Sequence, residues 1–279
     1  MKKISRRSFL AASGLTIAAL ALTACGGSAS TASSAASSVA ASSEAASTSA
    51  AAAELTTVEA GKLTMATNAA FPPYEMTTDA GAFEGIDIDT AQAIADKLGL
   101  ELQIDDMDFD AALLSVQQGK ADIAMAGVTV TDERKNVMDF SDSYATGIQS
   151  IIVPEGSDIA SPDDLAGKMI GTQRGTTGYI YCSDDFGDDA VVAYDDGLTA
   201  VQALNNGQVD AVVIDNAPAK EFVAANPGLL LLDTSYAEED YAIGMAKNSP
   251  LEDAVNAALE ELKADGTLQS IVDKYITAE

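Results

Sequence analysis

The segment 121–134 carries a single arginine, Arg134, shortly after Gly127 and Thr129. A guanidinium group can hold a carboxylate with two parallel hydrogen bonds. Free backbone N–H groups at the start of a helix favour the same kind of anion. These residues therefore predict a binding site for a small carboxylate. The alternative is an ordinary strand–turn–helix unit whose arginine is solvated or pairs with Asp132.

Two local elements must position this arginine. The apolar run 123–126 predicts a buried strand that ends near Gly127. Thr131 is a favourable helix N-cap, and Asp132 and Glu133 suit the first turn of a helix. A strand end and a helix start are therefore expected to meet beside Arg134.

An acid with the complementary charge follows a second apolar strand. Residues 117–122 and 205–210 read QQGKAD and NNGQVD, and each precedes an apolar run. This weak repeat has an offset of 88 residues (117 to 205) and places Asp215 at the position equivalent to Gly127. Chance similarity between two α/β units is the alternative to a true repeat, and Asp215 could also serve as a helix N-cap.

The repeat predicts two similar lobes with a cleft between them, because ligands of α/β sheets lie beyond the carboxyl ends of the strands. A cation on one lobe and an anion on the other describe a receptor for a zwitterion. Arg134 would bind an α-carboxylate and Asp215 an α-ammonium group, each with a charge-assisted bond of ~1.5–3 kcal/mol.

Short apolar strands alternate with amphipathic helices from Gly61 onward, which is typical of an α/β fold with mostly parallel sheets. The final pair of helices is predicted to begin at Ser249-Pro250-Leu251-Glu252, a capping-box pattern, and to break at Gly266. The strands are expected at 62–67, 100–104, 123–126, 169–172 and 211–214, and the other helices at 87–98, 110–118, 198–206 and 218–225.

The composition excludes several classes of function. The chain has 15 basic and 43 acidic residues, so we expect no nucleic-acid partner, since such binding needs clustered Lys and Arg. Solubility at an exposed surface is the simpler explanation of the acidity. No histidine is present, which excludes Ser-His-Asp and Cys-His nucleophile systems and nearly every transition-metal site. We therefore expect no catalytic residue, no metal and no cofactor.

The first 24 residues have the features of a signal peptide: a basic start and an apolar segment of about 14 residues. The sequence LTAC at 22–25 resembles the lipobox of bacterial lipoproteins, in which Cys25 would be acylated. SRRSFL at 5–10 also resembles a twin-arginine signal, although ordinary secretory leaders can carry an Arg-Arg pair. Residues 25–56 are rich in Ala and Ser and are expected to form a disordered tether.

Two further segments follow predicted strands and could face the cleft. QRGTTG at 173–178 lacks the Gly-Lys-Ser/Thr ending of a phosphate loop, so a turn that donates N–H and hydroxyl groups to a carboxylate fits it better. NAAFPPYE at 68–75 could shape a pocket for a ligand side chain, or could be merely structural. Cys182 is expected to be a bystander in a loop.

Eight motifs together resemble the family-3 extracellular solute-binding proteins, the receptors of ATP-driven importers of polar amino acids. They extend over about residues 60–276 and read FPPYE (71–75), FEGIDID (83–89), AGVTVTDER (126–134), FSDSY (140–144), DDLAGK (163–168), GTTG (175–178), GQVDAVVID (207–215) and EDYAIGMAK (239–247). The resemblance implies a two-lobed, type II periplasmic-binding-protein-like fold with two hinge crossovers. Lobe 1 would comprise 57–147 plus 240–279, and lobe 2 would comprise 148–239.

The resemblance also implies roles for individual residues. Arg134 would bind the α-carboxylate, assisted by Thr129 and by N–H groups at Thr177. Asp215 would bind the α-ammonium group with help from Thr129 and the Gly127 carbonyl. Phe71 and Phe109 match positions that enclose the ligand side chain, and Asn68 and Gln173 match positions that read its polar end. The implied ligand-binding residues are Asn68, Phe71, Phe109, Ala126, Gly127, Thr129, Arg134, Gln173, Thr177 and Asp215.

One departure bears on specificity: family receptors for basic amino acids usually carry an acid where this chain has Asn68. We therefore expect a neutral polar ligand such as glutamine. The expected protein is a monomer, lipid-anchored at Cys25 outside the cytoplasm, on the outer face of a Gram-positive membrane or in a periplasm. It would deliver an L-α-amino acid to the membrane permease of an ABC importer. The alternative is a cyclohexadienyl or arogenate dehydratase on the same fold; a signalling receptor domain is less supported.

Overall fold

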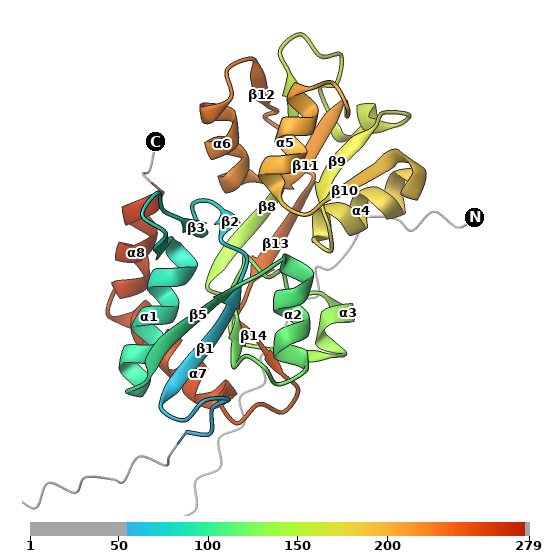
Figure 1. Ribbon diagram of the computed structural model, residues 1–279. Helices are drawn as coiled ribbons and strands as arrows, with labels where there is room; N and C mark the ends of the chain where they lie inside the picture. The colour runs from blue at the N-terminus through green and yellow to red at the C-terminus, as the bar shows by residue number, and fades with distance from the viewer. Residues whose placement is uncertain (1–54, 277–279) are drawn as a thin grey trace, which may run out of the picture. The chain divides into compact units, whose positions relative to one another are not determined.

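The computed structural model of the chain describes residues 55–276, which belong to one compact unit. The predicted signal peptide (1–24), the acylated Cys25 and almost all of the predicted tether (25–56) lie outside the described residues. Leu55, near the end of that tether, is half-buried and packs against a hydrophobic core. Figure 1 shows the described residues as two lobes joined by strands that run between them.

The first lobe is built on a five-stranded sheet in the order β5-β1-β6-β14-β7. β1 pairs in parallel with β5 and with the central strand β6, and β14 pairs antiparallel with β6 and β7. The bounds along this order are Glu101–Asp106, Lys62–Thr67, Ile123–Ala124, Gly244–Ala246 and Met138–Phe140. A small second sheet is formed by β2 (Ala70–Phe71), β3 (Glu75–Thr77) and β4 (Phe83–Glu84).

Helices cover both faces of the first sheet. α1, α7 and α8 pack against one another and contribute to the large core cluster, whereas α2 packs on a separate cluster around Ala66, Ala124 and Met138 (Figure 1). The helices are α1 (Ile86–Leu98), α2 (Phe109–Gln117), α3 (Asp132–Lys135), α7 (Glu252–Ala264) and α8 (Thr267–Tyr275). Within residues 55–276 none of the helices has the length and apolarity needed to cross a membrane.

The second lobe repeats this design. β9 pairs in parallel with β10 and β11, and β8 pairs antiparallel with β11, β12 and β13. The strands are β8 (Ala145–Pro154), β9 (Ile170–Gln173), β10 (Val191–Tyr194), β11 (Ala211–Asp215), β12 (Leu229–Leu231) and β13 (Ala237–Tyr241). The helices are α4 (Thr177–Phe186), α5 (Gly197–Asn205) and α6 (Asn216–Ala225), with 3₁₀ turns η1 (Pro162–Leu165) and η2 (Asp188–Ala190).

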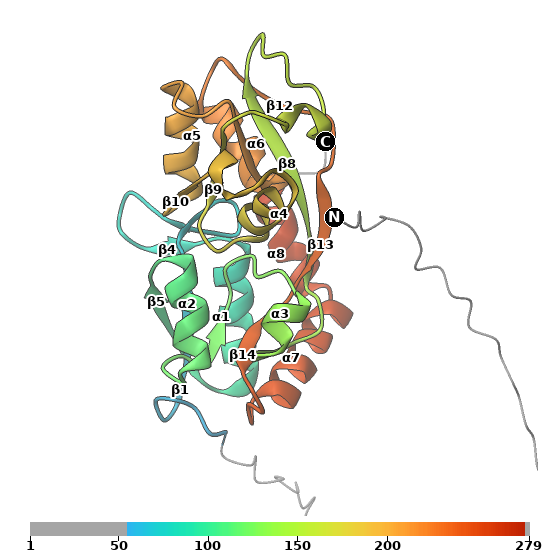
Figure 2. The same cartoon turned by 90° about the vertical axis from the view of Figure 1, so that its right-hand side faces the viewer.

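Two strands connect the lobes. β8 and β13 pair antiparallel, and Figure 2 shows both running from one lobe to the other. An isolated bridge between Thr129 and Tyr241 joins this ribbon to the loop that precedes α3. After β13 the chain returns to the first lobe, where β14 enters the sheet between β6 and β7. The two crossovers therefore form a ribbon that can serve as a hinge.

The structure confirms most of the helices expected from the sequence and corrects others. Thr131 caps α3, because its hydroxyl accepts a bond from the Arg134 backbone N–H at 3.1 Å. The capping box at 249–252 is wrong: α7 begins only at Glu252, its N-cap is Leu251, and no side chain caps it. Ser249 instead accepts from the Leu251 N–H at 3.2 Å and so closes the turn that precedes the helix.

The expectation that Cys182 lies in a loop is also wrong. Cys182 is buried within α4, whose N-cap Thr176 accepts from the Tyr179 backbone N–H at 3.4 Å. This helix was missed because its sequence, TGYIYCSDDF, is rich in weak helix formers. Tertiary packing around Cys182 stabilises a helix that local propensity does not favour.

Candidate functional site

All the sequence-predicted ligand-binding residues line one cavity between the lobes. The enclosed volume of this cavity is only about 10 Å³, roughly the room that one water molecule needs. Two residues outside the predicted ligand-binding set, Glu75 and Thr176, also line it; both belong to segments that the sequence suggested could face the cleft. The complete lining is Asn68, Phe71, Glu75, Phe109, Ala126, Gly127, Thr129, Arg134, Gln173, Thr176, Thr177 and Asp215.

Arg134 is buried in this cavity, with 8% of its surface exposed. Its guanidinium donates to the Thr129 carbonyl at 2.8 Å and, across the cleft, to the Gly175 carbonyl at 3.1 Å. It also lies 5.3 Å from the centre of the Phe109 ring. Burial lowers the pKa of Arg134, and the negative field of Glu239 opposes that effect. A guanidinium has five N–H donors, so several remain for a ligand.

The simpler interpretations of Arg134 do not describe the structure. The side chain is not solvated, and within residues 55–276 no ion pair joins it to Asp132. A buried cation is costly unless it is compensated. Arg134 is therefore held by two carbonyl groups and an aromatic ring in a place where an anionic ligand can reach it.

The start of α4 adds backbone donors to the same cavity. Thr176 and Thr177 are the N-cap and the first residue of this helix, and both line the cavity. The first N–H groups of a helix have no acceptor within the helix, and the helix dipole favours an anion there. Arg134 from one lobe and the α4 N-terminus from the other can therefore bind one carboxylate together.

Asp215 supplies the opposite charge at the end of β11, with 7% of its surface exposed. The Tyr241 hydroxyl donates to Oδ1 of Asp215 in a very short hydrogen bond. Burial raises the pKa of Asp215 to about 6, and the bond from Tyr241 opposes that rise. Its side chain does not cap α6, although it occupies the N-cap position. The alternative role of Asp215 as a capping side chain is therefore not what the structure shows.

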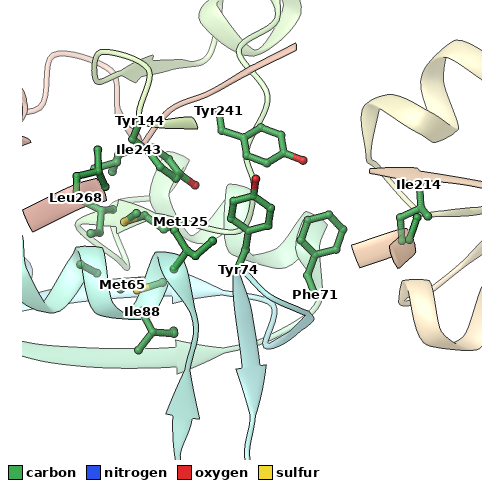
Figure 3. Close-up of a cluster of buried hydrophobic side chains, with 14 of the residues drawn as sticks. Met65, Phe71, Tyr74, Ile88, Met125, Tyr144, Ile214, Tyr241, Ile243 and Leu268 are labelled. Carbon is green, nitrogen blue, oxygen red and sulfur yellow. The ribbon is translucent and has the colours of Figure 1, made fainter. Parts of the chain in front are cut away.

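Aromatic rings pack beside this acid. Figure 3 shows Phe71, Tyr74 and Tyr241 next to one another, with Ile214 of the second lobe opposite Phe71. The ring centres of Phe71 and Tyr74 are 6.1 Å apart, and those of Tyr74 and Tyr241 are 5.3 Å apart. A charge interaction beside these apolar rings is stronger than one in water, because the local dielectric constant is lower.

Two further acids, missed from the sequence, lie at the cavity or next to it. Glu75, in the lining, and Asp87 are both fully buried, and Asp87 accepts from the Gly127 backbone N–H at 3.0 Å. Burial, reinforced by the charge of Asp87, raises the pKa of Glu75 well above its ordinary value. Among the described residues no cluster of three or more His, Cys, Asp or Glu side chains could hold a metal ion.

The pocket for a ligand side chain is framed by two amides. Gln173 donates to Asn68 at 2.8 Å across the cleft, and Asn68 donates to the Met107 carbonyl at 3.0 Å. Phe71 and Phe109 line the same cavity and are both almost fully buried. The structure therefore places the two amides and the two predicted aromatic residues in one cavity.

The weak sequence repeat corresponds to equivalent structural units. α2 leads into β6, which pairs in parallel with β1; α5 leads into β11, which pairs in parallel with β9. Gly127 follows the first of these strands and Asp215 ends the second, and both line the cavity. The repeat therefore predicted the place of Asp215 in the fold, because Asp215 is the equivalent of Gly127 in the second lobe.

Comparison with known proteins identifies relatives over most of the chain. The family model for bacterial extracellular solute-binding proteins, family 3, matches residues 63–278, a range that includes every predicted ligand-binding residue. The L-cystine-binding protein TcyJ of Escherichia coli K12 is 32% identical over 226 residues, covering 79% of this chain and 85% of TcyJ.

Solved structures give the same result. The arginine-, lysine-, histidine-binding protein ArtJ from Geobacillus stearothermophilus has a TM-score of 0.75 and 35% identity, covering 78% of this chain and 96% of that chain. An ancestral arginine-binding protein bound to glutamine has a TM-score of 0.75 and 41% identity, covering 79% of this chain and 100% of that chain.

Proposed function

The chain belongs to the family-3 extracellular solute-binding proteins of bacteria, and we propose that its cleft captures one L-α-amino acid as a zwitterion through Arg134 and Asp215. The fold is the two-lobed type II fold of periplasmic binding proteins. The relatives are binding proteins for amino acids, not enzymes, so the dehydratase alternative is set aside. The role of the protein is to supply an amino acid to an ABC importer, and its partner is the importer's membrane permease.

One observation carries this proposal. A buried guanidinium and a buried carboxylate, contributed by different lobes, line the same cavity. An amino acid carries the two matching charges on neighbouring atoms, so both lobes can bind it at once. Arg134 and the start of α4 would bind the carboxylate, while Asp215 and the Gly127 carbonyl would bind the ammonium group.

The ligand side chain would be neutral and polar, as in glutamine. Asn68 and Gln173 are both uncharged, and each amide offers one acceptor and two donors. Such a pair can satisfy a ligand amide without burying an uncompensated charge.

Arginine is the second candidate, and a specific observation favours it. A second cavity of about 140 Å³ shares Phe109 with the main one and is lined by Arg174 and by three carboxylates, Asp108, Asp110 and Asp195. These carboxylates would attract the cationic end of a longer ligand that extends past Phe109.

The location of the protein follows from the same proposal. Family members act outside the cytoplasm, and the LTAC sequence supports acylation of Cys25 as the membrane anchor, with residues 25–56 as a tether. Residues 57–147 plus 240–279 and residues 148–239 would then act as the two lobes of a monomer. Replacing Cys25 with alanine should release the protein from the membrane fraction if Cys25 carries the lipid.

A ligand screen tests the central proposal. The melting temperature would be measured with each of the twenty amino acids and with prephenate and arogenate, followed by calorimetry for every compound that stabilises the fold. A ligand at ~100 times its dissociation constant adds about 2.7 kcal/mol to the free energy of unfolding. Stabilisation by glutamine or arginine is the expected result. Stabilisation by none of the amino acids, or turnover of prephenate or arogenate, would overturn the proposal.

A further inference from the structure

A buried glutamate that the proposed amino-acid site does not use lies in the ribbon between the lobes. Glu239 is on β13 opposite Gly147 of β8, and only 7% of its surface is exposed. Its Oε2 atom accepts from the Thr177 hydroxyl at 2.8 Å, from Gln149 Nε2 at 3.1 Å and from the Thr129 hydroxyl at 3.2 Å. One oxygen thus binds a hydroxyl group from each side of the cleft.

Both threonines also line the ligand cavity, whereas Glu239 does not. They are almost fully buried, with 4% of Thr129 and 2% of Thr177 exposed. The glutamate therefore lies behind two residues that a ligand would touch. Its hydrogen bonds to these two threonines connect it to the ligand cavity.

The chemistry of a hydroxyl group decides what those contacts do. A hydroxyl has one proton to donate and two lone pairs to accept with. Because Thr129 and Thr177 both donate to Glu239, only their lone pairs are left for a ligand. A lone pair binds an ammonium group and repels a carboxylate.

This division of roles agrees with the rest of the cavity. Arg134 and the first N–H groups of α4 already provide donors for a carboxylate. Glu239 is also the largest source of the negative field that supports the charge of Arg134. If the two hydroxyl protons were free, they could donate to a ligand. The cleft would then also accept a ligand that carries a hydroxyl or keto oxygen in place of the α-amine.

We propose that Glu239 is a positioning residue of the ligand site: by taking the protons of the Thr129 and Thr177 hydroxyls, it makes the cleft select ligands that carry an α-ammonium group. This inference rests on the proposed function. It goes further by assigning selectivity against 2-hydroxy and 2-oxo acids to a residue outside the cavity.

Three variants separate this role from a simple structural one. Glu239→Ala removes the acceptor. Glu239→Gln removes the charge but keeps a carbonyl oxygen that can accept hydrogen bonds from both hydroxyls. Glu238→Ala is the matched control, because Glu238 is the exposed neighbour on the same strand.

The first measurement needs no ligand. Urea unfolding of the full chain would be followed for Glu239→Ala, Thr177→Val and the double variant. If the Thr177 hydroxyl acts through Glu239, the double variant should have the same urea midpoint as Glu239→Ala alone. Midpoint shifts that add would show no coupling and would contradict the inference.

The second measurement is calorimetry with L-glutamine and L-arginine, each compared with the analogue that carries a hydroxyl in place of the α-amine. The preference for the amine, expressed as the ratio of the two dissociation constants, should fall about tenfold or more in Glu239→Ala, as expected for the gain or loss of one hydrogen bond. Glu239→Gln should keep most of the wild-type ratio, and Glu238→Ala all of it.

The outcomes are distinguishable. Equal losses for the amino acid and its analogue in Glu239→Ala, or a ratio in Glu239→Gln that falls as far as in Glu239→Ala, would overturn the role of Glu239 while leaving the proposed function intact. Absence of binding of any amino acid to the wild-type chain would instead overturn the proposed function, and this inference with it.

Discussion

Gln173 donates a hydrogen bond to Asn68 at 2.8 Å and so links the end of β9 in the second lobe to the loop after β1 in the first. Both residues line the ligand cavity. We therefore expect closure of the lobes and recognition of a ligand side chain to involve the same pair of amides. A ligand with a polar end must satisfy these amides or displace them from each other.

Changing Asn68 to aspartate should shift the ligand preference toward cationic amino acids. The carboxylate can still accept the bond from Gln173, but it adds a charge that a lysine or arginine side chain can neutralise. The ratio of glutamine to arginine dissociation constants, measured by calorimetry, should move toward arginine by about tenfold or more.

The matched control for this variant is Asn206→Asp, which makes the same charge change at an exposed position of the second lobe. It should leave the ratio unchanged. If the wild-type chain already prefers arginine, Asn68 does not set the neutrality of the pocket and this interpretation is wrong.

Arg134→Ala should remove detectable amino-acid binding, a loss of about 100-fold or more, because the fork that holds the carboxylate is gone. The variant also loses the bond to the Gly175 carbonyl across the cleft. Lys135→Ala is the control, since Lys135 is the exposed basic neighbour of Arg134 on α3. Unchanged affinity of Arg134→Ala by calorimetry would contradict the zwitterion site.

Much of this site could be predicted because it depends on local patterns. Thr131 caps the helix that carries Arg134, and the repeated helix–strand unit places Asp215 opposite it. Periodicity and capping are properties of short segments, so the sequence reveals them directly. The pairing of β1 with parallel neighbours follows from the same alternation of strands and helices.

The residues that were missed depend on contacts between distant segments. Glu239 meets Thr129 and Thr177, which are separated from it by 110 and 62 positions. In the sequence Glu75 has no feature that distinguishes it from an ordinary exposed acid, but the fold buries it in the lining of the cavity. Nothing in a short window marks an acid as buried, since acids are usually exposed. Only the assembled lobes reveal these two roles.

The stability of the ligand-free protein should fall as the pH rises from 5 to 7. Burial raises the pKa values of Asp215 and Asp87 to about 6, above their ordinary value of 3.8. A carboxyl that binds its proton more tightly when folded stabilises the fold at low pH, and this stabilisation is lost as the pH rises through the folded pKa. Chemical denaturation should show a difference on the order of 1–3 kcal/mol between pH 5 and pH 7.

Asp215→Asn provides the control for this pH dependence, which should shrink in the variant because one of the buried carboxyls with a raised pKa is removed. A slope that is unchanged in Asp215→Asn, or a stability that rises from pH 5 to 7, would contradict the assignment. Surface carboxyls such as Asp139, whose pKa is lowered by Lys247, act in the opposite sense but only at lower pH.

Ligand affinity should follow the opposite trend. An α-ammonium group needs Asp215 in its ionised form, so affinity should fall by up to about tenfold for each pH unit below about 6. Calorimetry between pH 4.5 and pH 8 on the wild-type chain would measure this pH dependence of the affinity. An affinity that is constant over this range would mean that Asp215 does not bind the ammonium group.

The hinge ribbon offers a last test, because Tyr241 of β13 in this ribbon donates a hydrogen bond to Asp215. A methyl group added at Gly147 of β8 would lie 2.4 Å from a carbon of the Tyr241 ring, which is fully buried and whose hydroxyl binds Asp215. Gly147→Ala should therefore displace the ring, lowering both the stability, by about 1–3 kcal/mol, and the ligand affinity. Tyr241→Phe keeps the ring and removes only the hydroxyl, so it should weaken binding with a smaller effect on the urea midpoint. Wild-type affinity in both variants would show that Tyr241 does not position Asp215 for the ligand.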